Sequence, residues 1–127
     1  MANLSVIIPA TGIESCSTAF ENNVTNGTSL TAIHTATNTN SIAFDKAEME
    51  SWLKGIDADT IKVVPGLYTT TFKNAIAEYF EGNPNKDEYV SYINDNLGRM
   101  TSFLVAYKSD TIISGDSAAF NLGTIEP

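Results

Sequence analysis

The chain has 127 residues, of which 43% are hydrophobic and 9% aromatic, and this composition suits one folded domain rather than a disordered chain. Fifteen acidic side chains against seven basic ones give a net charge of −8, the opposite of the cationic surface that binds phosphates. We therefore expect neither nucleic-acid binding nor membrane binding. An acidic surface suits solubility, or a basic protein partner.

The supply of metal-binding and nucleophilic side chains is small. Cys16 is the single cysteine and His34 the single histidine, so one chain can form neither an internal disulfide nor a metal site of several cysteines or histidines. We expect no metal and no cofactor. The start of the chain, "MANLSVIIPATG", has no basic region, and its apolar run is too short for a signal sequence. A cytoplasmic protein is the expectation, with Cys16 as a buried free thiol.

Residues 1–43 differ in character from the rest of the chain. They contain two charged side chains, Glu14 and Glu21, and many Ser, Thr and Asn residues, which favour turns, caps and strands over helix interiors. We find no helical periodicity there and predict a β-rich segment. Its expected parts are a strand in "LSVII", a hairpin in "VTNGTSLTAIHTAT" turning at Asn26-Gly27, and a short strand or lead-in at "SIAF".

Residues 44–127 predict the order helix, strand, helix, helix, strand, strand. The first helix starts at Asp45, which forms a capping box with Glu48, and Gly55 marks its end. One apolar stripe runs along it at i, i+3, i+4 and i+7: Met49, Trp52, Leu53 and Ile56. The following "TIKVV", residues 60–64, predicts a strand that Pro65-Gly66 terminates.

Two further helices are predicted from apolar stripes. The second stops at Gly82, and its apolar stripe consists of Phe72, Ala75, Ile76, Tyr79 and Phe80. The third runs from about Lys86 to Leu97 and closes at Gly98, with Asn85 and Glu88 as its capping pair and Tyr89, Ile93 and Leu97 as its buried line. A short loop, "EGNPNK", joins these two helices into a hairpin.

The C-terminal part predicts strands. "SFLVAY", residues 102–107, is apolar on both faces and so indicates an interior strand. "KSD" predicts a turn, "TII" a returning strand, and "AFNL" a last edge strand. The fold class expected from all these elements is a single α+β domain, with a mixed or mostly antiparallel sheet of about five strands packed by three amphipathic helices.

The stretch "IDADTIKVVPGLYTTTF", residues 56–72, looks most like a binding site. Asp57 and Asp59 are too few oxygen ligands for a calcium loop, and we expect them to cap free backbone N–H groups. Thr69, Thr70 and Thr71 precede a helix, whose N-terminus favours an anion. The simpler interpretation is that one threonine is the N-cap of that helix.

Catalytic constellations are weak. His34 with Cys16 or Ser29 would supply a base and a nucleophile, yet no nucleophile motif surrounds them, and a half-exposed strand residue is the favoured interpretation of His34. Pairs of carboxylates are an alternative acid–base route. The glutamates of the first two predicted helices, however, lie off the apolar stripes: Glu48, Glu50, Glu78 and Glu81.

Four tyrosines are candidates for an interface, because a stiff ring with one polar atom suits protein contacts. Tyr79, Tyr89 and Tyr92 fall on the helical hairpin, and Tyr68 lies in the turn before it. Tyr92 sits off the main stripe of its helix, so we expect its ring to be exposed. The alternative is that all four only flank the core.

The function favoured by the sequence is a non-enzymatic interaction or accessory module that binds a basic protein partner and that also self-associates. The first alternative is an enzyme, or a small-ligand or anion-binding protein. It requires His34, Asp57, Asp59 and the threonines 69–71 to converge on one cavity. A second alternative is a structural role in which the low-charge residues 1–43 pair with a neighbouring chain through strand edges.

Overall fold

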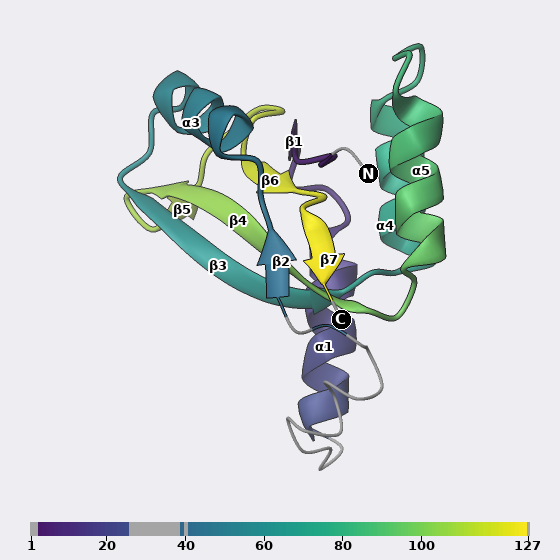
Figure 1. Cartoon of the computed structure of the whole chain (residues 1–127). Helices are drawn as coiled ribbons and strands as arrows, with labels where there is room; N and C mark the ends of the chain where they lie inside the picture. Colours follow the sequence, from purple (N-terminus) through teal and green to yellow (C-terminus); the bar gives the residue numbers. More distant parts are fainter. Residues whose placement is uncertain (1–2, 26–38, 40, 127) are drawn as a thin grey trace.

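The structure is a computed structural model that describes residues 3–25, 39 and 41–126. Within these residues, four helices and a mostly antiparallel five-stranded sheet form one compact α+β domain (Figure 1). The predicted fold class is therefore confirmed. The helix count exceeds the expected three by one, because residues 13–25 are helical.

The five-stranded sheet has the order β1-β6-β4-β3, and β5 pairs with β4 beside this path. Its strands are β1 (Val6–Ile8), β3 (Thr60–Leu67), β4 (Met100–Lys108), β5 (Thr111–Ile112) and β6 (Ala119–Asn121). A second sheet joins β2 (Ser41–Ala43) to β7 (Thr124–Glu126). All the strand pairs formed by the described residues are antiparallel.

The central strands correct one prediction and confirm two. β4 has neighbours on both sides, as its continuous apolar run predicted. β5 returns beside β4, as expected for "TII". The prediction of an edge strand at "AFNL" is wrong, because β6 lies between β1 and β4 and all three of its residues are buried.

Two apolar cores lie on opposite faces of the sheet. On one face α1 (Ile13–Thr25), α4 (Thr70–Tyr79) and α5 (Lys86–Asp95) share a core with the buried strand residues Phe103 and Val105. On the other face α3 (Lys46–Gly55) brings Trp52 against Phe120, with ring centroids 5.5 Å apart. Figure 1 shows α3 above the sheet, α1 below it, and the α4–α5 pair at the right.

The N-caps of α3 and α4 are as predicted, but the capping box of α3 is only half formed, because the Asp45 N–H donates to the Ser5 hydroxyl at 3.0 Å and not to Glu48. The Asp45 carboxylate accepts a hydrogen bond from the Glu48 N–H at 2.9 Å, and α3 ends at Gly55 as expected. The Thr69 hydroxyl accepts from the Phe72 N–H at 3.1 Å. The predicted apolar stripe of α3 is wrong at Leu53, which is exposed. Trp52 is the fully buried residue of this helix.

The start and end of α5 differ from the prediction. Asn85 holds the N-cap position, but its side chain makes no capping hydrogen bond, and its N–H donates to the Asn83 side chain at 2.8 Å. Tyr89 and Ile93 are buried as expected. Leu97 is exposed, because α5 ends at Asp95 and the chain turns away before Leu97 can face the core.

Helix α1 overturns the expectation that residues 1–43 are β-rich. The strands predicted in "LSVII" and "SIAF" are present as β1 and β2. The proposed hairpin begins instead in the last residues of α1, and its turn and second arm lie outside the described residues. Ser, Thr and Asn favour turns in isolation, but packing against the sheet overrides that preference. Ile13 and Cys16 are buried in the core.

Pro65-Gly66 does not end β3, which continues to Leu67. Proline is tolerated there because β3 lies at one edge of the sheet. Gly66 is required by close packing: a Cβ atom would lie 2.9 Å from the Cys16 Cβ and 2.9 Å from a ring carbon of Phe103. Pro65-Gly66 is therefore part of a strand and not a turn, and its glycine lets α1 approach the sheet.

Candidate functional site

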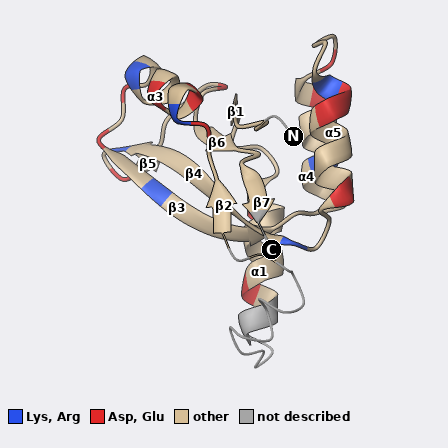
Figure 2. Cartoon of the chain, in the orientation of Figure 1, with Lys and Arg blue, Asp and Glu red and all other residues tan. Residues whose placement is uncertain are grey.

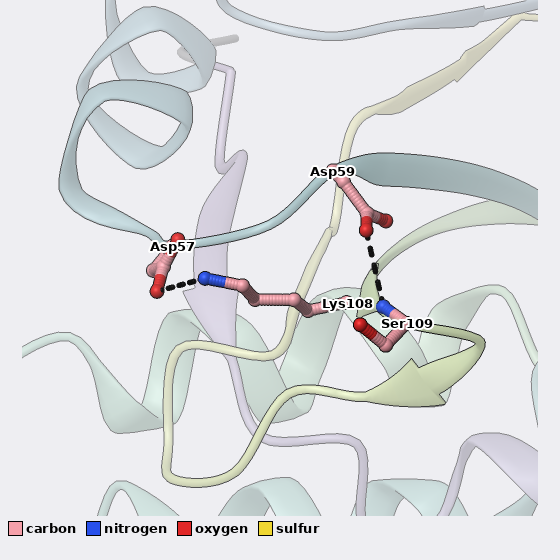
Figure 3. Close-up of polar contacts among 4 residues, drawn as sticks. All are labelled: Asp57, Asp59, Lys108 and Ser109. Carbon is pink, nitrogen blue, oxygen red and sulfur yellow. Dashed lines mark hydrogen bonds and ion pairs between the residues drawn. The ribbon is translucent and has the colours of Figure 1, made fainter.

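Asp57 and Asp59 connect the loop after α3 to the β4–β5 hairpin (Figure 3). The Asp57 carboxylate pairs with the Lys108 ammonium at 2.5 Å, and both side chains are largely exposed. The Asp59 carboxylate accepts hydrogen bonds from the Ser109 N–H at 3.1 Å and the Thr60 hydroxyl at 3.0 Å. These donors stabilise the charged form, so the pKa of Asp59 is lowered.

The hairpin explains why a carboxylate is needed at Asp59. Ser109 and Asp110 form the predicted turn, with φ angles of 52° and 65°, the left-handed conformations of a tight hairpin. The Asp59 carboxylate satisfies one N–H of that turn. Of the two aspartates that we expected to cap backbone groups, Asp59 does so, whereas Asp57 forms an ion pair instead.

A groove of about 630 Å³ lies beside this connection. Its lining combines the Asp57–Lys108 pair with three hydroxyl side chains and three isoleucines: Thr111, Ser114, Ser117, Ile56, Ile112 and Ile113. The carboxylate and the ammonium neutralise each other, so the groove offers no net charge to hold an ion. The contacts of Asp57 and Asp59 therefore hold the loop after α3 against the β4–β5 hairpin.

Thr69, Thr70 and Thr71 lie at the N-terminus of α4. Thr69 caps the helix, and its hydroxyl lies 2.7 Å from the Ser15 hydroxyl of α1. The Thr69 hydroxyl already binds the Phe72 N–H, while Thr70 and Thr71 are exposed. These contacts favour the capping interpretation over an anion site.

Cys16 lies next to the threonine cap and is fully buried, as predicted. Its sulfur is 3.7 Å from the Thr69 hydroxyl. Burial raises the pKa of the Cys16 thiol, which outweighs the lowering by hydrogen bonds from Thr69 and Ser15. A thiol held protonated and away from water is a poor nucleophile.

The residues proposed for a ligand site do not converge. Asp57 and Asp59 precede β3 and the threonines follow it, so the strand separates them by roughly 25 Å at about 3.3 Å per residue. His34 lies outside the described residues. The alternative of one cavity built from the 57–72 stretch is therefore dropped.

Tyr68 is buried and belongs to a polar network inside the core. Its hydroxyl donates to the Asn121 side-chain oxygen at 2.9 Å, and the Asn121 amide donates to the Ser102 carbonyl at 2.6 Å. Burial raises the pKa of Tyr68. Asn121 could not be singled out from the sequence, because an asparagine in "AFNL" carries no sign of its burial. Tyr68 is buried and therefore not available to a partner.

Two tyrosines of the helical hairpin also make contacts inside the domain. Tyr89 is buried against Phe80, with ring centroids 4.7 Å apart. Tyr92 is half-buried, which corrects the expected exposure of its ring. Its hydroxyl donates to the Gly123 carbonyl at 2.8 Å and accepts from the Ile125 N–H at 2.9 Å. Tyr92 thus ties α5 to β7.

Tyr79 differs from the other three because its side chain is 39% exposed. It lies on a small groove of about 230 Å³ together with Glu78 and Asp116, and the rest of the lining is Pro9, Thr11 and Ala75. Partial burial raises the pKa of Tyr79, and the negative charge of Asp116 raises it further. Sequence reasoning missed Asp116, since only tertiary structure brings its loop to α4.

No family model matches the chain, and no curated protein or solved structure is significantly similar to it. No helix in residues 3–25, 39 and 41–126 is both long and apolar enough to cross a membrane. Over the same part of the chain, no three metal-binding side chains come together. The groove at Tyr79, Glu78 and Asp116, which we call the Tyr79 groove, remains as the candidate functional site.

Proposed function

We propose that this protein is a non-enzymatic interaction module that binds a basic protein partner through the Tyr79 groove. The observation that carries the proposal is an exposed tyrosine ring on a groove that is also lined by two carboxylates, which have no cationic partner among the described residues. The three ion pairs among the described residues use Glu50, Glu81 and Asp57, and they leave Glu78 and Asp116 without one. A partner's lysine or arginine would supply the missing charge.

The distribution of charge supports the same function. The chain carries a net charge of −8, and Figure 2 shows acidic positions on α5, which pairs with α4, the helix that contains Tyr79. A field of one sign accelerates the encounter with a partner of the opposite sign. Contacts between the partner's cation and the two carboxylates would then hold the complex in register.

The Tyr79 ring is suited to an anchor because it is already held in place. The Phe80 ring packs against it edge-on, with centroids 4.7 Å apart and an interplanar angle of 76°. Little side-chain freedom is then lost on binding. A cation above such a ring contributes about 0.5–1 kcal/mol at an exposed site.

A cytoplasmic location belongs to the same proposal. It is supported by Cys16, the single cysteine, which is a buried free thiol and not part of a disulfide. The acidic field opposes binding to nucleic acid and to anionic membranes. Self-association is not required by the Tyr79 groove and stays a separate prediction.

The test is affinity capture from a lysate of the native organism, repeated at low and high ionic strength. We compare the wild-type chain with the double variant Glu78→Gln/Asp116→Asn and with Tyr79→Ser. The expected result is a basic protein that the wild-type chain retains, that salt releases, and that both variants lose. Binding that is indifferent to ionic strength would contradict the proposal.

The matched control is the double variant Glu21→Gln/Asp110→Asn. It also removes one glutamate and one aspartate, both exposed, and Asp110 has a positive φ angle that asparagine tolerates. This control should retain the partner, with a small loss from the reduced net charge. An equal loss in the two double variants would mean that general charge, and not the Tyr79 groove, is responsible.

A further inference from the structure

Strand β3 has a second, open side. Among the described residues its sole neighbouring strand is β4, so the groups on its outer side meet no other described strand. Unpaired N–H and C=O groups on a sheet edge are a template for a further strand. Two exposed apolar side chains, Ile61 and Val63, belong to this strand.

The hydrogen bonds of β4 establish which β3 residues face outwards. The Ala106 N–H donates to the Ala118 carbonyl, and the Ala106 carbonyl accepts from the Ile113 N–H, so both groups of Ala106 point away from β3. Because these directions alternate along a strand, Val105 points towards β3 and pairs with Lys62. The backbone N–H and C=O groups of the even-numbered residues of β3 therefore bond to β4. Those of the odd-numbered residues point to the open side of the sheet.

The outward residues form a short apolar ladder. Ile61 and Val63 each present an N–H and a C=O group, and Pro65 presents a carbonyl alone. The side chain of Val63 is 64% exposed and that of Ile61 is 37% exposed, and these two lie on the same face of the strand. An added strand would bond to this ladder and cover both side chains.

A second copy of the chain fits this edge poorly. An antiparallel self-pairing centred on Lys62 sets two like charges directly opposite each other. One centred on Val63 sets Ile61 against Pro65, which has no N–H to donate. Shifting the centre to Ile61 sets Val63 against Asp59, whose N–H already donates to the Tyr107 carbonyl at 3.0 Å.

The charge on the edge indicates a different occupant. Lys62 is exposed, lies 4.0 Å above the Tyr107 ring, and forms no ion pair with a described residue. Its backbone points to β4, so a residue opposite it on an added strand would form a non-hydrogen-bonded pair. Side chains approach most closely in such pairs. A carboxylate at that position complements Lys62.

We propose that the β3 edge binds an extended segment of another protein by strand addition, with apolar side chains over Ile61 and Val63 and a carboxylate opposite Lys62. This surface is separate from the Tyr79 groove, and the inference does not rest on the proposed function. A failure of either leaves the other standing.

The first experiment measures hydrogen exchange of backbone amides in the free full-length chain. The amides of Ile61 and Val63 are expected to exchange rapidly, while those of Lys62 and Val64 are protected by β4. Protection of all four amides would overturn the inference, since the edge would then already be paired.

The second experiment adds the acetylated and amidated peptide Val-Thr-Val-Glu-Val-Thr-Val, followed by NMR. Four valines occupy one face, and the glutamate lies on the other face opposite Lys62. Binding should shift and protect the Ile61 and Val63 amides. We expect this peptide to bind roughly two- to fivefold more tightly than the version with lysine at its centre, and Lys62→Glu to reverse that order.

A control peptide carries N-methyl groups at its two central valines, which removes the bonding N–H groups while keeping the side chains. It should not protect the edge amides. The inference is overturned if this peptide binds as well as the parent, or if the parent causes no shifts at millimolar concentration. A dimer seen by light scattering that protects the same two amides would assign the edge to a second copy instead.

Discussion

Replacing Gly66 by alanine is expected to destabilise the protein, although it adds a single methyl group. Gly66 lies where α1 crosses β3, and the added Cβ atom would be 2.9 Å from both the Cys16 Cβ and a Phe103 ring carbon. The Cys16 backbone carbonyl carbon is 3.1 Å away. None of these groups can move aside by a simple rotation, because Cys16 and Phe103 are fully buried.

The size of the effect follows from this overlap. Overpacking a well-filled core costs typically 1–3 kcal/mol, and contacts to a backbone atom and a Cβ place Gly66→Ala near the middle, at about 2 kcal/mol. With about 2.1 cal/mol/K per residue as the entropy of unfolding, a chain of 127 residues should lose roughly 7 °C in melting temperature.

The assay is urea unfolding followed by the fluorescence of Trp52, which is the single tryptophan and is fully buried. The control is Gly55→Ala in the last turn of α3, where an added Cβ meets nothing within 4 Å. This control should be neutral, or stabilising by up to about 1 kcal/mol. Equal stability of Gly66→Ala and the wild-type chain would refute the reasoning on helix approach.

Three further predictions concern buried and loop groups. Tyr68→Phe leaves the Asn121 side-chain oxygen buried without its donor, so urea unfolding should show a loss of about 1–3 kcal/mol, and an unchanged midpoint would count against the network. The Ser109 N–H lowers the pKa of Asp59 in the folded protein below its ordinary value of 3.8. The charged Asp59 side chain therefore stabilises the fold above pH 3.8, and this contribution is lost as the pH falls through the folded pKa. Asp59→Asn should therefore flatten the acid side of a plot of melting temperature against pH, and an unaltered slope would argue against this role. Cys16 should resist an aromatic disulfide reagent in the native chain and react in urea, because burial raises its pKa and blocks access; equal rates in both states would contradict the burial.

The predictions that succeeded rest on local patterns. The 3.6-residue stripe and the cap at Asp45 located α3, and a threonine cap located α4. The β-branched run of "TIKVV" and the two-sided apolar run of "SFLVAY" located β3 and β4. Each of these signals is contained within about ten residues and needs no knowledge of what packs against it.

The candidate site was predictable in part. Tyr79 was among four tyrosines that the sequence singled out, but composition does not distinguish an exposed ring from one bonded inside the core, as Tyr92 is. Asp116 was not singled out, because it lies 37 positions beyond Tyr79 and joins it through the fold alone. The same limit applies to Asn121, a polar residue whose burial depends on Tyr68 and Ser102.

The sequence by itself determined the class of the fold, the position of three helices and the sign of the surface charge, because periodicity, capping and composition are local or additive properties. Tertiary structure alone decided that residues 13–25 form a helix, that Pro65-Gly66 continues a strand, and which tyrosine remains exposed. In each of these cases the local preference is weak, and burial against a distant segment outweighs it.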